Sequence, residues 1–377
     1  MTPPHLWGDK IENAMLDAFE PFTQYITYLA EGKLDGYFNS IQPEKLVTDL
    51  KVELPTQPML LLHGLGENID MEAVENLFTS DTVFVVFLAS FSWQITNPGF
   101  AWYSHLFAVS GAGKTRRALE GLCHHWGFYI SYRPHRRIGS SDFQAAIEIM
   151  TTMSKWDDKS GQNTTKNDDV ANRAFAMLIC ARVFVLKQLF ERLPPNTDNV
   201  VARRRWIFAQ VIPPFAPFEE VDMFTQIIQS PRGAVEKDTL HLARTMLRGM
   251  NRMQKLFVVV DEAQVAAEYL SDYFRSFTAG TDMRPVLHAF HKFLWGTMIF
   301  QGVILAGTGL SMEKVKKTIL SGAARSTDSR KYPTVSVELG RFTKNRTSHV
   351  DYIRKYWPPS ISDQRLEDRI LYWFSGR

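Results

Sequence analysis

The chain has 377 residues, of which 45% are hydrophobic, so it is long enough to bury the core of one large α/β domain or of two smaller ones. Its 43 basic and 40 acidic residues give a net charge of +3, and this near balance does not indicate a nucleic-acid-binding protein. Cys123 and Cys180 are too few for a disulfide framework and indicate reduced thiols in an intracellular protein, either cytoplasmic or nuclear.

The N-terminus lacks a basic stretch followed by an apolar one, so we expect no signal peptide. The segment 82–109 begins with an apolar run, but Gln94, Asn97 and Pro98 interrupt it before the ~20 residues that a membrane span needs. The sequence therefore predicts no transmembrane helix and no membrane partner.

The first elements in chain order are helical. Residues 1–57 are expected to form a helical N-terminal region, in which Asp9–Leu29 is the clearest amphipathic helix and ends near Gly32. Met59–His63 is then a short strand candidate that ends at glycines. We expect the main α/β core to span 58–340.

The most specific motif runs from Ala108 to Thr115 and has the spacing of a phosphate-binding loop, with Ala108 where glycine is more usual. An apolar run precedes it and a helix-like run over 116–126 follows, which is the strand, turn and helix order of a triphosphate site. The expected nucleotide-binding residues are Ser110, Gly111, Ala112, Gly113, Lys114 and Thr115.

The residue types of this loop have separate roles. Gly111 and Gly113 let consecutive backbone N–H groups turn toward phosphate oxygens. Lys114 brings a positive charge to the β- and γ-phosphates, and the Thr115 hydroxyl can ligate Mg²⁺. The alternative is an ordinary glycine-containing turn.

Alternating strands and helices follow, which predicts a parallel sheet flanked by helices. The expected elements are a strand at 127–130, helices at 142–156 and 171–192 joined by a polar linker at 157–169, and a strand at 206–212. The run Arg203 to Arg205 beside the last strand is either a phosphate or nucleic-acid contact or, more commonly for such runs, a solvated edge.

A second motif follows Leu256–Val260, a short β-branched run that is typical of a buried parallel strand. Asp261 and Glu262 come directly after it, and two adjacent carboxylates are costly there unless they emerge over a site. We expect Asp261 to hold Mg²⁺ together with Thr115, and Glu262 to polarise the attacking water. The alternative is a helix N-cap aspartate followed by a solvent-facing glutamate.

A third element is the strand candidate Gly302–Ala306, which a glycine-rich turn follows. We expect this strand to lie beside the acid-bearing one, with Thr308 at its tip sensing the γ-phosphate. The alternative is a turn without a ligand. Residues 341–377 are then expected to be a helical segment. Its abrupt aromatic end indicates either a truncated domain or an aromatic C-terminal helix that docks on the core.

Taken together and in order, these motifs resemble the P-loop ATPase region of fungal Crinkler-type (crinkling-and-necrosis-like) proteins. The segments that carry the resemblance are Pro58–His63 with Leu65–Gly66, Ser110–Arg116 with Trp126–Gly127, Ile138–Asp142, Val260–Gln264 with Phe274–Ser276, Ala306–Ser311 and Phe374–Arg377.

The resemblance implies an α/β P-loop NTPase of the additional-strand, AAA- or STAND-like class, in which the catalytic glutamate directly follows the metal-holding aspartate. It also implies a late arginine, here Arg377, and an accompanying effector region that is often nuclease-like. The chain departs from the family pattern at 79–104, which is either a true insertion or an unspliced segment of the gene.

The expected function is therefore an ATPase that binds ATP with Mg²⁺ and hydrolyses it slowly as a switch. ATP is preferred to GTP because the chain has no Asn-Lys-x-Asp string. The transition-state arginine is expected to be Arg377, Arg275 or a residue from a neighbouring subunit. Homo-oligomerisation and an effector protein or domain are the expected partnerships.

Two alternatives stay open. One is a nucleotide-gated interaction module without significant turnover. The other is a nucleic-acid-stimulated ATPase or helicase, which predicts a second motor core and a basic channel with stacking aromatics. A single phosphate-loop motif and the near-neutral charge count against the second alternative.

Overall fold

The structure of the chain is a computed structural model. It describes residues 4–38, 50, 52–54, 61–62, 65–66, 78, 102–108, 114–132, 139–153, 162–215, 221–231, 236–250, 256–275, 283–297, 299–308, 365 and 368–369. Most of 79–104 and of 341–377 therefore lies outside the described residues. The strand expected at Met59–His63 also lies largely outside them, and its two described residues, Leu61 and Leu62, form a turn rather than a strand.

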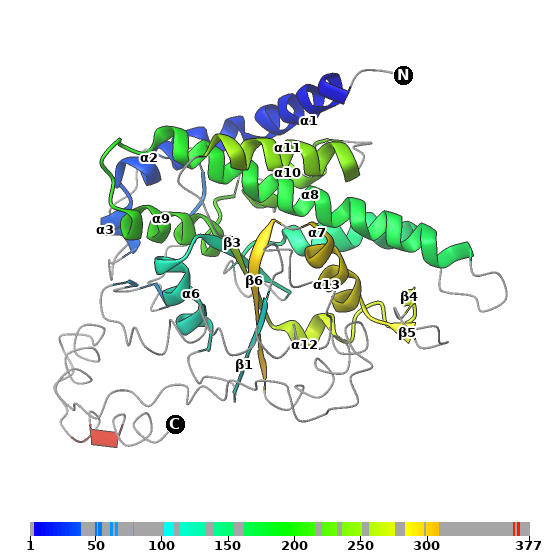
Figure 1. The fold of residues 1–377 in the computed structure, drawn as a ribbon. Coiled ribbons are helices and arrows are strands. Elements are labelled where there is room, and N and C mark those ends of the chain that lie inside the picture. Colours follow the sequence, from blue (N-terminus) through cyan, green and yellow to red (C-terminus); the bar gives the residue numbers. More distant parts are fainter. Residues whose placement is uncertain are drawn as a thin grey trace, which may run out of the picture.

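A four-stranded parallel sheet forms the centre of the fold (Figure 1). Its strands lie in the order β1 (Trp102–Ala108), β6 (Phe300–Thr308), β3 (Leu256–Asp261) and β2 (Gly127–Ser131). The strands expected at 127–130, 256–260 and 302–306 are thereby confirmed, and so is the position of the last beside the acid-bearing strand. The general expectation of an α/β fold with a parallel sheet is also confirmed.

The register brings the carboxyl ends of all four strands to one edge of the sheet. Ala108 pairs with Thr308, and Ser131 pairs with Asp261. Because Val260 pairs with Leu305, Asp261 lies level with the residue after Leu305, and Thr308 lies two residues further along. Polar residues that follow these strands therefore meet at this edge.

Helices surround the sheet. The described helices are α1 (Pro4–Phe19), α2 (Thr23–Glu31), α3 (Asp35–Phe38), α6 (Lys114–His124), α7 (Asp142–Ile149), α8 (Gln162–Arg192), α9 (Asn199–Val211), α10 (Met223–Gln229), α11 (Glu236–Gly249), α12 (Ala263–Ala266) and α13 (Val286–Thr297), with 3-10 turns η1 (Glu20–Phe22) and η3 (Met150–Thr152). A two-stranded antiparallel ladder joins β4 (Phe274–Arg275) to β5 (Met283–Arg284). None of these described helices is long and apolar enough to cross a membrane.

The long helix α8 organises the layer above the sheet in the view of Figure 1, where α10 and α11 lie against it and α1 lies outermost. It begins at Gln162, well before the expected start at residue 171, so part of the expected polar linker is helical. Asn167 and Asp168 explain the difference, because they bind the carbonyl of Tyr273 and the amine of Lys292, both at 2.7–2.8 Å. Polarity in this segment therefore reflects tertiary contacts, which a sequence pattern does not reveal.

The expected strand at 206–212 is wrong, because these residues belong to helix α9. Asp198 caps that helix and accepts hydrogen bonds from the N–H groups of Val200 and Val201, at 2.8 and 3.2 Å. The second half of α9 is buried nearly all round, so its apolar run lacks the periodicity that marks a helix. A short buried helix and a buried strand look alike in such a run.

Two arginines in the middle of α9, Arg203 and Arg205, have partners inside the fold rather than forming a solvated edge. Arg205 is buried and bonds Asp35 through Nε and Nη2, at 3.2 and 2.8 Å, while its Nη1 donates to the carbonyl of Ala30. The guanidinium of Arg203 lies 5.5 Å from the ring centre of Trp126. Arg205 therefore attaches α9 to the N-terminal helices, and Arg203 contacts the residue that precedes β2.

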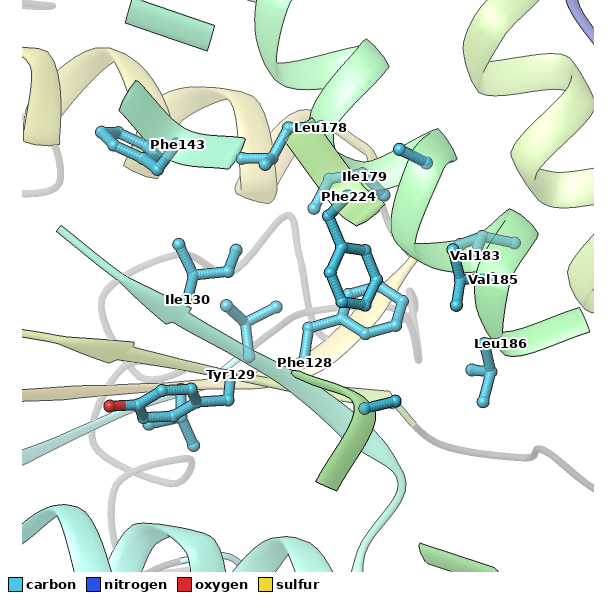
Figure 2. Close-up of a cluster of buried hydrophobic side chains, with 14 of the residues drawn as sticks. Phe128, Tyr129, Ile130, Phe143, Leu178, Ile179, Val183, Val185, Leu186 and Phe224 are labelled. Atoms are coloured by element: carbon cyan, nitrogen blue, oxygen red, sulfur yellow. The ribbon is translucent and has the colours of Figure 1, made fainter. Parts of the chain in front are cut away.

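The core lies between the sheet and this helical layer. Figure 2 shows Phe128 and Ile130 of β2 facing apolar side chains of α8 and α10, among them Phe224, whereas the ring of Tyr129 points to the other side of the strand. Side chains that point to opposite faces in turn are the period-2 pattern of a β-strand. Because all five residues of β2 are buried, this strand packs against neighbours on both faces.

Side chains from two helices satisfy the open edge of β2. The N–H of Tyr129 donates to Gln210 Oε1 at 2.8 Å, and the carbonyl of Tyr129 accepts from Arg182 Nη1 at 2.7 Å. The carbonyl of Gly127 accepts from Trp206 Nε1 at 2.7 Å. The edge of the sheet therefore has side-chain partners where a further strand would otherwise be needed.

Arg182 is held in turn by a fully buried ion pair. Its Nε and Nη2 donate to the two carboxylate oxygens of Asp142 at 2.7 and 2.9 Å, and both side chains are 0% exposed. Asp142 opens α7, directly after Ser140 and Ser141, which bond Asp222 at the start of α10 at 2.8 Å. The segment ending in Asp142 thus links α7, α8, α10 and the edge of the sheet.

The first prediction concerns this pair. Arg182→Met should lower the free energy of unfolding by about 3–5 kcal/mol, because it leaves the Asp142 carboxylate buried without its partner. Urea unfolding monitored by circular dichroism measures the change. As a control, Lys292→Met removes the half-exposed pair with Asp168 and should cost at most about 1 kcal/mol. A loss at Arg182 as small as the control's would contradict this account.

Candidate functional site

The candidate site lies where β3 ends and α6 begins. The hydroxyl of Thr115, in the first turn of α6, donates to Asp261 Oδ2, the last residue of β3, at 2.7 Å. These residues are 146 positions apart in the chain and come from the two motifs that the sequence singled out. The fold therefore joins the loop motif and the acidic motif directly.

The Asp261 carboxylate accepts hydrogen bonds from three different segments. Besides Thr115, the hydroxyl of Tyr129 donates to Oδ2 at 2.9 Å, and the backbone N–H of Glu262 donates to Oδ1 at 2.9 Å. Asp261 is only 4% exposed, and burying a polar group to this extent is costly unless it has hydrogen-bond partners. The three donors hold its plane in one orientation.

Lys114 is the first residue of α6 and is buried. Burial lowers the pKa of its amine below the usual 10.5, and the nearby carboxylates of Asp261 and Glu262 oppose this effect only in part. The amine is therefore a desolvated positive charge at a helix N-terminus. An anionic group placed there would gain both this charge and the positive end of the helix dipole.

Glu262 has a backbone conformation that is unusual for a residue with a side chain. Its φ of 55° and ψ of 36° lie in the left-handed region, and it is followed at once by α12. Such a conformation costs of order 1 kcal/mol and is often found at functional sites. The Glu262 carboxylate, which is half-buried, accepts a hydrogen bond from the side-chain amide of Gln264.

The segment before the loop is attached to the same helix. Arg116 Nη1 donates to the carbonyl of Leu61 at 2.7 Å, and Glu120 Oε2 accepts from the N–H of Gly66 at 2.8 Å. Arg116 and Glu120 also form an ion pair within α6. Leu61 and Gly66 are thus each bonded to a side chain of α6.

The remaining expected site residues are only partly described. Ser110, Gly111, Ala112 and Gly113 lie outside the described residues, and so does Arg377. Thr308 ends β6, opposite Ala108, so its backbone lies at the same edge of the sheet as Asp261. Arg275 belongs to β4, which in Figure 1 lies on the opposite side of β6 from α6. The structure brings together Lys114, Thr115, Asp261 and Glu262 and does not bring Arg275 to them.

Sequence reasoning missed two residues that bind the acidic motif, Tyr129 and Gln264. The signal for Tyr129 was a phenol inside the otherwise apolar strand candidate 127–130, since a buried hydroxyl needs a hydrogen-bond partner. Gln264 follows the acidic pair by two residues, and no pattern distinguished it from a surface glutamine.

The oxygens at this site are of the kind that Mg²⁺ prefers, a carboxylate and a hydroxyl. Within the described residues there is no group of three or more His, Cys, Asp or Glu side chains able to hold a metal by themselves. Thr115 and Asp261 therefore fit a metal that brings most of its ligands with it, as magnesium does when it is bound to phosphates.

Comparison of the chain with protein-family models, with curated proteins and with solved structures gave no match in any of the three. The arguments for function consequently depend on the residues of this site and on the sequence motifs.

The second prediction concerns the stability cost of the buried amine. Lys114→Met should melt at or above the temperature of the wild type at neutral pH, because burial disfavours the charged amine more than the carboxylates favour it. Differential scanning calorimetry measures the melting temperatures.

The pH dependence of that difference follows from linkage. In the unfolded chain Lys114 has its ordinary pKa of 10.5, and in the folded chain its pKa is lower. Between these two pKa values the unfolded state binds more protons, so wild-type stability rises with pH relative to Lys114→Met, and the gap in melting temperature should narrow as the pH rises toward 10.5. A variant that melts far below the wild type at neutral pH would disprove the assignment of Lys114 as a destabilising charge.

Proposed function

We propose that this chain is an α/β P-loop NTPase that binds ATP with Mg²⁺ at the N-terminus of α6 and hydrolyses it slowly, as a switch. The observation that carries the proposal is the hydrogen bond between Thr115 Oγ1 and Asp261 Oδ2, at 2.7 Å. It joins the hydroxyl expected at magnesium to the carboxylate expected at magnesium.

The strand order supports the same proposal. Strand β6 lies between β1, which precedes the phosphate-binding motif, and β3, which ends in the acidic pair. A strand inserted between these two is what the name of the additional-strand class describes, and in that class the catalytic glutamate follows the metal-holding aspartate. Asp261 and Glu262 stand in that order.

The roles of the binding residues follow from their chemistry. The Lys114 amine would balance the negative charge of the β- and γ-phosphates, and the backbone N–H groups of the sequence motif from Ser110 to Lys114 would donate to the phosphate oxygens. Thr115 and Asp261 hold the metal, which when bound neutralises phosphate charge. Because the Thr115 hydroxyl donates its hydrogen bond to Asp261, the lone pairs of that hydroxyl oxygen would be left for the metal.

Hydrolysis is assigned to Glu262, whose carboxylate would orient the attacking water and accept its proton. Thr308, at the end of the strand between the two motifs, is proposed to contact the γ-phosphate. A positive charge is also needed for the transition state, and Arg377 or an arginine of a second subunit is proposed to provide it. Arg275 is a weaker candidate, because β4 lies away from α6 (Figure 1).

The family, the domain boundaries and the partners stay predictions. Membership of the Crinkler-type ATPases, the division into 1–57, 58–340 and 341–377, the insertion at 79–104, and an effector or homo-oligomeric partner all rest on sequence patterns.

One observation favours the alternative of an interaction module with negligible turnover. One oxygen of the Glu262 carboxylate accepts a hydrogen bond from the side-chain amide of Gln264, which leaves fewer of its lone pairs for an attacking water. No comparable observation favours nucleic-acid stimulation, because Arg203 and Arg205 have partners inside the fold.

The third prediction tests binding and turnover together. Wild-type protein should bind ATP with Mg²⁺ and release phosphate. Lys114→Ala should lose binding, because no other side chain of the loop motif carries a positive charge. Glu262→Gln should keep binding and lose turnover by about 10²- to 10⁴-fold, since it keeps the shape and removes the base. Isothermal titration calorimetry and phosphate release measure the two properties.

The outcomes distinguish an ATPase from an interaction module with negligible turnover. ATP binding with no turnover in either wild type or Glu262→Gln would favour the interaction module. Absence of ATP binding by the wild type would refute the proposed function.

A further inference from the structure

The hydroxyl of Tyr129 is a buried polar group that the mechanism above does not use. Tyr129 is 3% exposed, and its hydroxyl donates to Asp261 Oδ2 at 2.9 Å. The side chain of Ser131 also hydrogen-bonds with this phenol.

The base of this side chain is fixed as firmly as its tip. The backbone N–H of Tyr129 is bonded to Gln210 and its carbonyl to Arg182, at 2.8 and 2.7 Å, and Arg182 is locked by its buried pair with Asp142. The ring leaves β2 on the side away from α8 (Figure 2). Both ends of the residue are therefore immobilised before any ligand arrives.

Two hydroxyls converge on one carboxylate oxygen. Asp261 Oδ2 accepts hydrogen bonds from the hydroxyls of Thr115 and Tyr129, and Oδ1 accepts one from the backbone N–H of the next residue, Glu262. Thr115 is also expected to turn toward the metal, so its contact with Asp261 has two functions. The Tyr129 contact has no second function, and it comes from the rigid sheet rather than from the loop.

We propose that Tyr129 is a positioning residue for magnesium, which holds the Asp261 carboxylate in the orientation that the metal requires. The inference rests on the proposed function of the site. It assigns to β2 a part in metal binding, in addition to β3 and α6. A magnesium ion bound by Thr115 would be reached by the Asp261 carboxylate only while that carboxylate keeps this orientation.

The fourth prediction follows. Tyr129→Phe keeps the ring and removes one hydrogen bond to a charged group. It should raise the Mg²⁺ concentration for half-saturation of the nucleotide complex by about tenfold, the usual effect of such a bond. ATP affinity without Mg²⁺ should not change, because Tyr129 does not belong to the phosphate-binding motif.

The matched control is Tyr132→Phe. Tyr132 is buried on the same chain segment, at 5% exposure, and its hydroxyl has no hydrogen-bond partner in the described part of the chain. It touches Asp261 only through the backbone, where its N–H donates to the Asp261 carbonyl at 3.2 Å. This variant should show the wild-type Mg²⁺ dependence.

The experiment uses a fluorescent ATP analogue, titrated into each protein in excess EDTA and at increasing Mg²⁺ concentration, after thermal unfolding has confirmed that all three proteins are folded. A raised Mg²⁺ half-saturation in Tyr129→Phe alone, with equal binding in EDTA, supports the proposal. An unchanged Mg²⁺ dependence overturns it and leaves the proposed function standing. Equal weakening with and without Mg²⁺ also overturns it, since that indicates a structural role.

The proposed function fails in a distinguishable way. If the wild type does not bind the fluorescent nucleotide under either condition, the ATP site itself is absent, and the role of Tyr129 falls with it.

Discussion

The carboxylate of Asp261 is the point on which this site depends. A charged group at the end of an apolar, fully buried strand is costly, and it is stable here because three segments donate hydrogen bonds to it. These donors come from the first turn of α6, from β2 and from the turn after β3. The same bonds that stabilise the carboxylate therefore set the distance between the first turn of α6 and the acidic pair, on which the proposed nucleotide chemistry depends.

The buried ion pair of Arg182 and Asp142 also contributes indirectly to the position of Asp261. Arg182 pairs with Asp142 and binds the carbonyl of Tyr129, so helices α7 and α8 determine where β2 lies. The hydroxyl of Tyr129 then bonds the Asp261 carboxylate, so the position of β2 helps to fix the position of that carboxylate. The helical layer and the candidate metal site are connected through one residue of one edge strand. In this way a polar network inside the core, which by itself is weak evidence of stability, gives the site a fixed geometry.

Sequence patterns predicted the parts of this arrangement that are local. The strands β2, β3 and β6 are short apolar runs that end in polar or glycine residues, and the loop motif marked the start of α6. The patterns failed at 206–212, where a helix buried on all sides has no polar face to show its period. They also missed the contact of Tyr129 with Asp261, which joins residues 132 positions apart, because partners at that separation depend on strand order. The roles of Ser110 to Gly113, Thr308 and Arg377 stay predictions.

The most direct test of the central claim is a crystal structure with a non-hydrolysable ATP analogue and Mn²⁺ in place of Mg²⁺, with the metal located by its anomalous scattering. The account predicts one manganese peak within coordination distance of Thr115 Oγ1 and next to the Asp261 carboxylate, with the γ-phosphate against Lys114. A nucleotide bound elsewhere, or a manganese ion that contacts neither Thr115 nor the shell around Asp261, would contradict it.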